Sequence, residues 1–72
     1  MRALTEIREE EPAIISYFTD PRVGAKLLSM GILPGYPIKI LRKTARGKTF
    51  YVKVGDNRFA IRKKEAACIV LK

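Results

Sequence analysis

The chain has 72 residues, a net charge of +8, no histidine and a single cysteine. Without histidine it lacks the usual general base near neutral pH and the commonest transition-metal ligand, so Ser–His and Cys–His hydrolases are excluded. A chain this short has room for one small domain, expected over residues 1–72, and its core can spare no contacts for a substrate cavity. The composition, 47% hydrophobic and 31% charged, is that of a folded chain. We therefore expect a binding module without a cofactor, not an enzyme.

The positive charge is unevenly distributed. Residues 1–20 hold two basic and five acidic residues, a net charge of −3, whereas residues 21–72 hold thirteen basic and two acidic residues, a net charge of +11. A basic body favours an acidic partner, which could be nucleic acid, an anionic membrane leaflet or an acidic protein surface. Simple solubilising charge is the competing interpretation.

The first residues contain no apolar leader stretch, and no run of about 18 apolar residues occurs, so we expect a cytoplasmic protein without membrane spans. Cys68 has no second cysteine with which to form a disulfide within the chain. Its apolar neighbours predict a small buried side chain and not a reactive thiol.

The first third of the chain predicts strands. Leu4–Ile7 is a weak candidate for a first strand, and an acidic run, Glu9–Glu11, separates it from the next. Ala13–Phe18 is rich in β-branched and aromatic residues, which is typical of a strand.

A short helix follows, predicted over about residues 21–30. Asp20 suits the N-cap, and Pro21 suits the first helical position. Gly31 fits the left-handed residue that commonly ends a helix. Between these signals, apolar residues recur at helical spacing, at Val23, Leu27 and Met30.

Beyond the helix, Pro34 and Gly35 predict a type II turn within Ile32–Gly35. The alternation over Tyr36–Lys43 predicts a strand with Tyr36, Ile38 and Ile40 on one face. Pro37 lacks a backbone donor, so we expect this strand to be an edge, or to start unpaired.

The last third predicts a hairpin and a closing strand. Thr49–Val54 is the clearest strand, with Phe50, Val52 and Val54 inward, and the Gly55-Asp56-Asn57 turn leads to a partner strand over Arg58–Ile61. The remaining elements are a short helical turn and a final strand, over Arg62–Ala66 and Cys68–Leu71. Five or six short strands with one helix indicate a small closed β-barrel, since closure removes exposed sheet edges.

Two segments resemble the ferrous iron transport protein A family. Val23–Gly35 is similar to the family's helix-and-turn signature, with a basic residue and Leu on the helix, then Met-Gly, an apolar residue and Pro-Gly. Arg58–Ala66, followed by Ile69 and Val70, is similar to the family's closing segment. The resemblance covers about residues 23–71. The chain departs from it at Glu9–Pro12, where family members usually have a Gly-containing turn.

This resemblance implies an SH3-like barrel that serves as a small cytoplasmic accessory protein of bacterial ferrous iron uptake. The implied partner is the membrane ferrous iron permease with its cytoplasmic GTPase domain, and regulation of that GTPase is left open. The resemblance carries no catalytic residue, and it implies transition-metal binding only at the level of the family. The same barrel also resembles the C-terminal domain of iron-dependent repressors, but this chain has no room for their helix-turn-helix.

The helix and turn give a first set of candidate partner-binding residues: Arg22, Lys26, Ser29, Ile32 and Leu33. We expect Ile32 and Leu33 to form an apolar tip that a partner covers, because two adjacent apolar residues beside a turn cannot easily both point inward. Helix termination and solvated charge are the purely structural alternative.

A second candidate set is a basic loop, Arg42, Lys43, Arg46 and Lys48. These cations could contact anionic lipid beneath the permease. They could also bind RNA, with Tyr51 or Phe59 stacking on a base, so a nucleic-acid-binding barrel is the alternative function. A dedicated metal site is not expected, because the carboxylates have no spacing that brings four ligands together.

Overall fold

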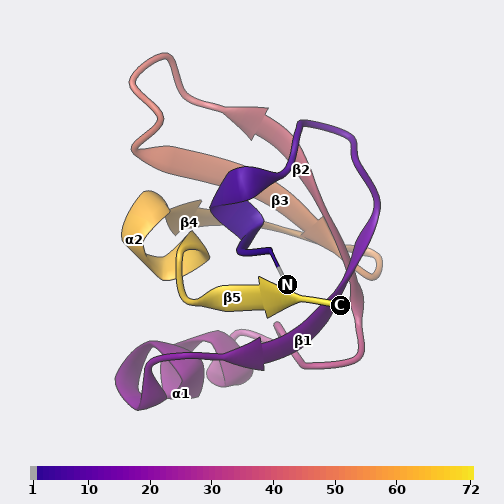
Figure 1. The fold of residues 1–72 in the computed structure, drawn as a ribbon, viewed down its shortest axis with the longest axis vertical. Coiled ribbons are helices and arrows are strands. Elements are labelled where there is room, and N and C mark those ends of the chain that lie inside the picture. The colour runs from indigo at the N-terminus through magenta and orange to yellow at the C-terminus, as the bar shows by residue number, and fades with distance from the viewer. Residues whose placement is uncertain (1) are drawn as a thin grey trace.

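The computed structural model describes residues 2–72 and places five strands in one antiparallel sheet, in the order β4-β3-β2-β1-β5 (Figure 1). The elements in chain order are η1 (Leu4–Glu6), β1 (Ala13–Phe18), α1 (Pro21–Ser29), β2 (Pro37–Lys43), β3 (Thr49–Val54), β4 (Asn57–Arg62), α2 (Lys63–Ala66) and β5 (Ile69–Leu71). The predicted mainly-β fold with one short helix is therefore confirmed, with five strands. The expected closure of the barrel by strand pairing is wrong, because β4 and β5 are the two ends of the sheet and do not pair with each other.

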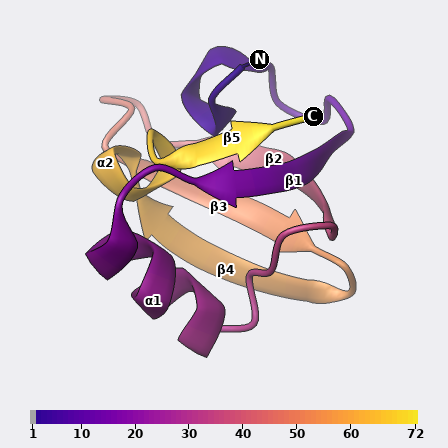
Figure 2. The same cartoon turned by 60° about the horizontal axis from the view of Figure 1, so that its bottom comes forward.

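The sheet bends around a core of aliphatic side chains that every strand supplies. In Figures 1 and 2, β1 and β5 cross over the β2–β3–β4 meander. Phe50, Val52 and Val54 point inward as predicted, because successive residues of a strand alternate between its faces. The two ends of the described chain meet, since the Leu71 N–H donates to the Arg2 carbonyl at 2.8 Å.

The predicted first strand, Leu4–Ile7, is wrong: this segment forms the 3-10 turn η1. The turn is closed by the Ile7 N–H, which donates to the Leu4 carbonyl at 3.4 Å. A helical turn brings residues three apart to the same side, whereas a strand would place them on opposite faces. Leu4 and Ile7 are both buried, so the turn is the conformation that buries the pair.

Helix α1 begins and ends where the sequence predicts. The Asp20 Oδ1 accepts hydrogen bonds from the backbone N–H groups of Arg22 (2.8 Å) and Val23 (3.0 Å). At the other end, Gly31 has φ 90°, its N–H donates to Leu28, and the next N–H, of Ile32, donates to Leu27. This pair of bonds is a Schellman motif, which satisfies helix carbonyls that would otherwise lack a donor.

The predicted type II turn is present, one residue later than predicted, over residues 33–36. The Tyr36 N–H donates to the Leu33 carbonyl at 3.2 Å, and Gly35 has φ 89°. The alternation predicted over Tyr36–Lys43 is wrong at Tyr36, which is 45% exposed while Ile38 and Ile40 are buried. Tyr36 belongs to the turn, and the alternation of β2 starts only at Pro37.

Strand β2 is not an edge strand, which corrects the expectation drawn from Pro37. It lies between β1 and β3, with Pro37 as its first residue, opposite Ile14 of β1. Proline has no backbone N–H to donate to a neighbouring strand. At the first residue of a strand, this loss disturbs the hydrogen bonds between strands least. A shift in register between Ile40 and Arg42 then bends β2.

Candidate interaction surface

The exposed face of α1 is the first candidate surface. Leu27 and Gly24 are buried, and the helix's solvent side carries Arg22, Lys26 and Ser29, as the sequence predicts. It also carries Leu28, which is 48% exposed and which the sequence analysis missed. The sequence does indicate this exposure, because Leu28 lies one residue outside the apolar stripe of the helix and so faces solvent.

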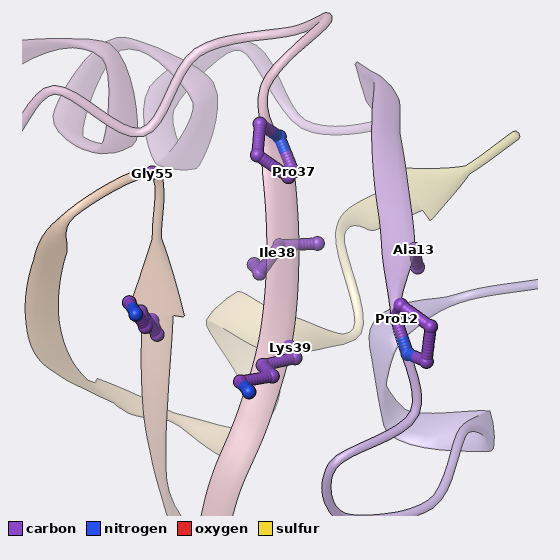
Figure 3. Close-up of a pocket in the computed structure, with 7 residues that line it drawn as sticks. Pro12, Ala13, Pro37, Ile38, Lys39 and Gly55 are labelled. Atoms are coloured by element: carbon purple, nitrogen blue, oxygen red, sulfur yellow. The ribbon is translucent and has the colours of Figure 1, made fainter.

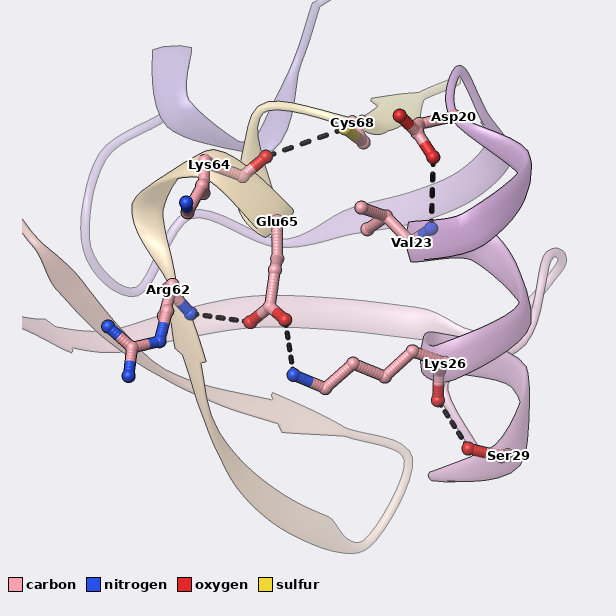
Figure 4. A network of polar contacts seen from close by, with 8 residues as sticks. All are labelled: Asp20, Val23, Lys26, Ser29, Arg62, Lys64, Glu65 and Cys68. Atoms are coloured by element: carbon pink, nitrogen blue, oxygen red, sulfur yellow. Dashed lines mark hydrogen bonds and ion pairs between the residues drawn. The ribbon is translucent and has the colours of Figure 1, made fainter.

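Lys26 is exposed, but its terminal amine is paired within the fold. Its Nζ lies 2.6 Å from the Glu65 Oε2, so the side chain ties α1 to α2 (Figure 4). The other carboxylate oxygen of Glu65 accepts a hydrogen bond from the Arg62 N–H at 2.8 Å. The Lys26 hydrogen bond, followed by that of Arg62, lowers the pKa of Glu65, and burial opposes them only in part. Lys26 therefore has a structural role that its position in the sequence did not reveal.

The remaining residues of this first set differ in the exposure and the hydrogen bonding of their side chains. Arg22 is exposed, with no ion pair among residues 2–72. Ser29 is exposed, but its Oγ donates to the Lys26 carbonyl at 2.6 Å. Leu33 is half-buried. The surface that a partner can reach is thus Arg22, Leu28, Ser29, part of Leu33 and the exposed part of Lys26.

The prediction that Ile32 and Leu33 together form an exposed apolar tip is wrong for Ile32. Ile32 has 0% exposure and belongs to the core. The Schellman motif explains this, because the residue after its glycine folds back onto the last turn, where Leu27 is also fully buried. A partner cannot contact Ile32 without opening the fold.

The residues of the basic loop set also differ in whether contacts within the fold hold their side chains. Lys43 is fixed in place: its backbone N–H donates to the Glu9 Oε2 at 2.8 Å, and its Nζ donates to the Ile7 carbonyl at 3.1 Å. The Nζ also lies 5.2 Å from the centre of the Phe50 ring. Lys43 therefore holds the N-terminal segment against β2 and β3, and it is not a free surface cation.

Arg42 points to the other side of β2. Its guanidinium lies over the ring of Tyr51, 4.9 Å from the ring centre, on the outer face of the sheet. One face of that ring, which base stacking would need, is thus covered. Arg46 and Lys48 remain as exposed cations of the loop between β2 and β3.

The acidic run Glu9–Glu11 lies against basic groups. Glu10 pairs with Lys39 (3.2 Å) and Glu11 with Arg2 (2.8 Å). The pKa of Glu11 is lowered, chiefly by the hydrogen bond from the Arg8 backbone and then by the Arg2 side chain. Part of the positive charge of the barrel is therefore neutralised here, at Lys39.

A shallow pocket of about 170 Å³ opens near the start of β2 (Figure 3). Its lining offers no carboxylate, thiol or imidazole, and consists of Pro12, Ala13, Pro37, Ile38, Lys39, Lys53 and Gly55. Within residues 2–72, moreover, no three His, Cys, Asp or Glu side chains are grouped so that they could hold a metal ion. No helix in this part of the chain is long and apolar enough to cross a membrane.

Cys68 is half-buried, so the prediction of a buried side chain is wrong in degree. It lies between α2 and β5, and its Sγ donates to the Lys64 carbonyl at 3.4 Å. The apolar neighbours in the sequence do not bury Cys68, because they alternate between the core and the surface.

A bent five-stranded antiparallel sheet with one short helix is the architecture of a small SH3-like domain, and solved structures confirm it. The FeoA of Stenotrophomonas maltophilia, crystallised with zinc and described as a prokaryotic SH3 domain protein, superimposes with a TM-score of 0.85 at 25% identity over 100% of this chain and 91% of its own. The iron(II) transport protein A of Clostridium thermocellum gives a TM-score of 0.88 at 28% identity, over 99% of this chain and 44% of its own.

The chain belongs to the FeoA family: the model of the FeoA domain matches residues 2–72. A manganese-dependent transcriptional repressor in complex with manganese shares the fold, with a TM-score of 0.87 at 17% identity, over 99% of this chain and 35% of its own. This confirms the resemblance to the repressor domain at the level of the fold. No curated protein sequence matches the chain.

Proposed function

We propose that this protein acts in bacterial ferrous iron uptake as a cytoplasmic binding protein and not as an enzyme. The observation that carries the proposal is the match of residues 2–72 to the FeoA domain. The Stenotrophomonas relative is described as a candidate activating factor of ferrous iron transport, which points in the same direction. The proposed partner is the cytoplasmic GTPase domain of the ferrous iron permease.

The exposed side of α1 is the surface we assign to this contact. Leu28 offers exposed apolar area, and Arg22 adds a cation that has no ion pair in the part of the chain that the structure describes. Protein interfaces combine exposed apolar area with charged groups, and the solvent side of α1 carries both. Asp20 and the Schellman motif hold both ends of this helix, so the surface is preorganised for binding.

Arg46 and Lys48 support a second, weaker contact. Both are exposed on the loop between β2 and β3. Each basic residue near an anionic leaflet contributes about 1 kcal/mol of attraction, so two of them can orient the protein beneath the permease without anchoring it.

A binding assay with the isolated GTPase domain tests the proposal. Wild-type protein is expected to retain the domain, whereas Arg22→Glu and Leu28→Glu lose it. Arg46→Glu is the matched control for charge reversal, because it lies in the loop away from α1. If the wild type retains no GTPase domain, the proposed partner is wrong. If Arg22→Glu and Leu28→Glu bind as well as the wild type, the surface on α1 is wrong.

A further inference from the structure

The two edge strands of the sheet differ in whether another segment covers them. At one end, the N-terminal residues cover β5: Ala3 bridges Val70, and the Leu71 N–H donates to the Arg2 carbonyl at 2.8 Å. At the other end lies β4, and Figure 2 shows no strand beyond it. Within residues 2–72, no backbone group of another segment bonds to Arg58 or Ala60 on the open side of β4. Such an open edge is a template for one more strand.

The register of the hairpin identifies which groups are free. Val54 and Asn57 close a two-residue turn, so Asn57, Phe59 and Ile61 bond to β3, and the residues between them point their backbone groups outward. The outward N–H of Arg62 is already taken, because it donates to the Glu65 Oε1 at 2.8 Å. The N–H and C=O groups of Arg58 and Ala60 remain, and both residues are exposed.

The charges beside this edge are arranged unfavourably for the free protein. Lys39, Lys53 and Arg58 lie directly opposite one another on three neighbouring strands, β2, β3 and β4. Like charges in facing positions destabilise a sheet. Glu10 offsets Lys39, but Lys53 and Arg58 have no ion-pair partner in the described part of the chain. An anionic group placed next to Arg58 would relieve this repulsion.

We propose that β4 accepts an acidic, extended polypeptide segment as a sixth, antiparallel strand. Facing residues share a face of the sheet, so acidic residues belong opposite Arg58 and Arg62, both of which point to the outer face. Apolar residues belong opposite Phe59 and Ile61, which point inward, and Phe59 is only half-buried. The segment that fits reads acid–apolar–any–apolar–acid, with its central residue opposite Ala60.

The other occupants of this edge fit less well. In an antiparallel pair of two copies centred on Ala60, Arg58 of one copy would face Arg62 of the other, so like charges oppose pairing. The chain's own acidic run is engaged elsewhere, since Glu10 pairs with Lys39 and the Glu10 N–H donates to the Ile40 carbonyl at 2.7 Å. This inference concerns a different surface from α1, and it holds whichever protein supplies the segment.

The test uses the synthetic peptide acetyl-Gly-Glu-Val-Thr-Val-Glu-Gly-amide and isotope-labelled protein at physiological salt. The peptide is expected to shift the amide resonances of Arg58 and Ala60 and to slow their hydrogen exchange. N-methylation of the threonine, which faces Ala60, should weaken binding at least tenfold. N-methylation of a valine, whose N–H points away from β4, is the matched control and should leave binding unchanged.

Variants test the same pairing from the side of the protein. Ala60→Pro removes an outward N–H and leaves the bonds to β3 intact, so it should abolish binding. Arg58→Glu should weaken binding about tenfold, and a peptide with lysine at its second glutamate should restore it. Because this rescue requires a folded protein, it separates lost contact from lost structure. The proposal is overturned if no peptide binds, if the shifts map to Arg46 and Lys48, or if the two N-methylated peptides bind equally.

Discussion

The Nζ of Lys26 and the Oε2 of Glu65 lie 2.6 Å apart, although 39 residues separate them in the chain. This contact joins the middle of α1 to the short helix α2. Glu65 is only 8% exposed, and both of its oxygens are satisfied, one by Lys26 and the other by the Arg62 N–H. A buried carboxylate is tolerated only with such partners. The position of α1, and with it the proposed docking surface, depends in part on this pair.

The first prediction concerns Glu65 and pH. Because the pKa of Glu65 is lowered in the folded protein, its contribution to stability is present above its ordinary pKa and is lost as the pH falls through the folded pKa. We expect Glu65→Gln to lower the free energy of unfolding at pH 7 by about 1 kcal/mol, allowing for the solvent exposure of Lys26. Urea denaturation of both proteins at pH 7, 5 and 3 measures this. The difference should shrink toward pH 3, and a constant difference would contradict the assignment.

The second prediction separates Ile32 from Leu33. Ile32 is fully buried in the core, so Ile32→Ala should lower the free energy of unfolding by about 2–5 kcal/mol. Leu33 is half-buried, and Leu33→Ala should cost clearly less. Thermal or urea denaturation of the two variants checks this, and similar losses would mean that both side chains are equally buried.

The third prediction concerns the backbone at Glu10, whose φ is 66°. A residue with a Cβ pays about 1–2 kcal/mol in this left-handed conformation, which glycine adopts freely. Glu10→Gln is the matched control, since it also loses the ion pair with Lys39 but keeps the Cβ. We expect Glu10→Gly to be more stable than Glu10→Gln by about 1 kcal/mol in urea denaturation. If the two variants unfold at the same urea concentration, Glu10 is not strained.

The fourth prediction concerns Leu28. Because its side chain faces solvent, Leu28→Glu should change the free energy of unfolding by no more than about 0.5 kcal/mol. The same variant is expected to lose binding to the GTPase domain. Denaturation and binding measured on one preparation distinguish a docking residue from a structural one. A large loss of stability would show that Leu28 supports the fold.

Much of the fold follows from local signals in the sequence. Asp20 and Pro21 start α1, Gly31 ends it, and Pro34-Gly35 makes the type II turn, because each depends on residues close in sequence. The alternation of Thr49–Val54 predicts both the strand and its buried face. The resemblance to the FeoA family came from the helix and turn, Val23–Gly35, and from the closing segment, Arg58–Ala66 with Ile69 and Val70.

The rest depends on contacts between distant parts of the chain. In the sequence, Lys26 has the pattern of a surface cation, and only the fold brings Glu65 beside it. Lys43 belongs to a basic run, but the folded N-terminal segment supplies Glu9 and the Ile7 carbonyl as its partners. The facing cations Lys53 and Arg58 become neighbours only once the register of β3 and β4 is known. Strand register and long-range pairing were therefore the limits of the sequence analysis.

The affinity of the purified protein for the permease's GTPase domain tests the central claim most directly. It can be measured by calorimetry at physiological salt, with single-stranded RNA as the competing ligand. We predict saturable binding of the GTPase domain, loss of that binding in Leu28→Glu, and no binding of RNA. RNA binding that survives physiological salt, together with no heat from the GTPase domain, would contradict the account and favour a nucleic-acid-binding barrel.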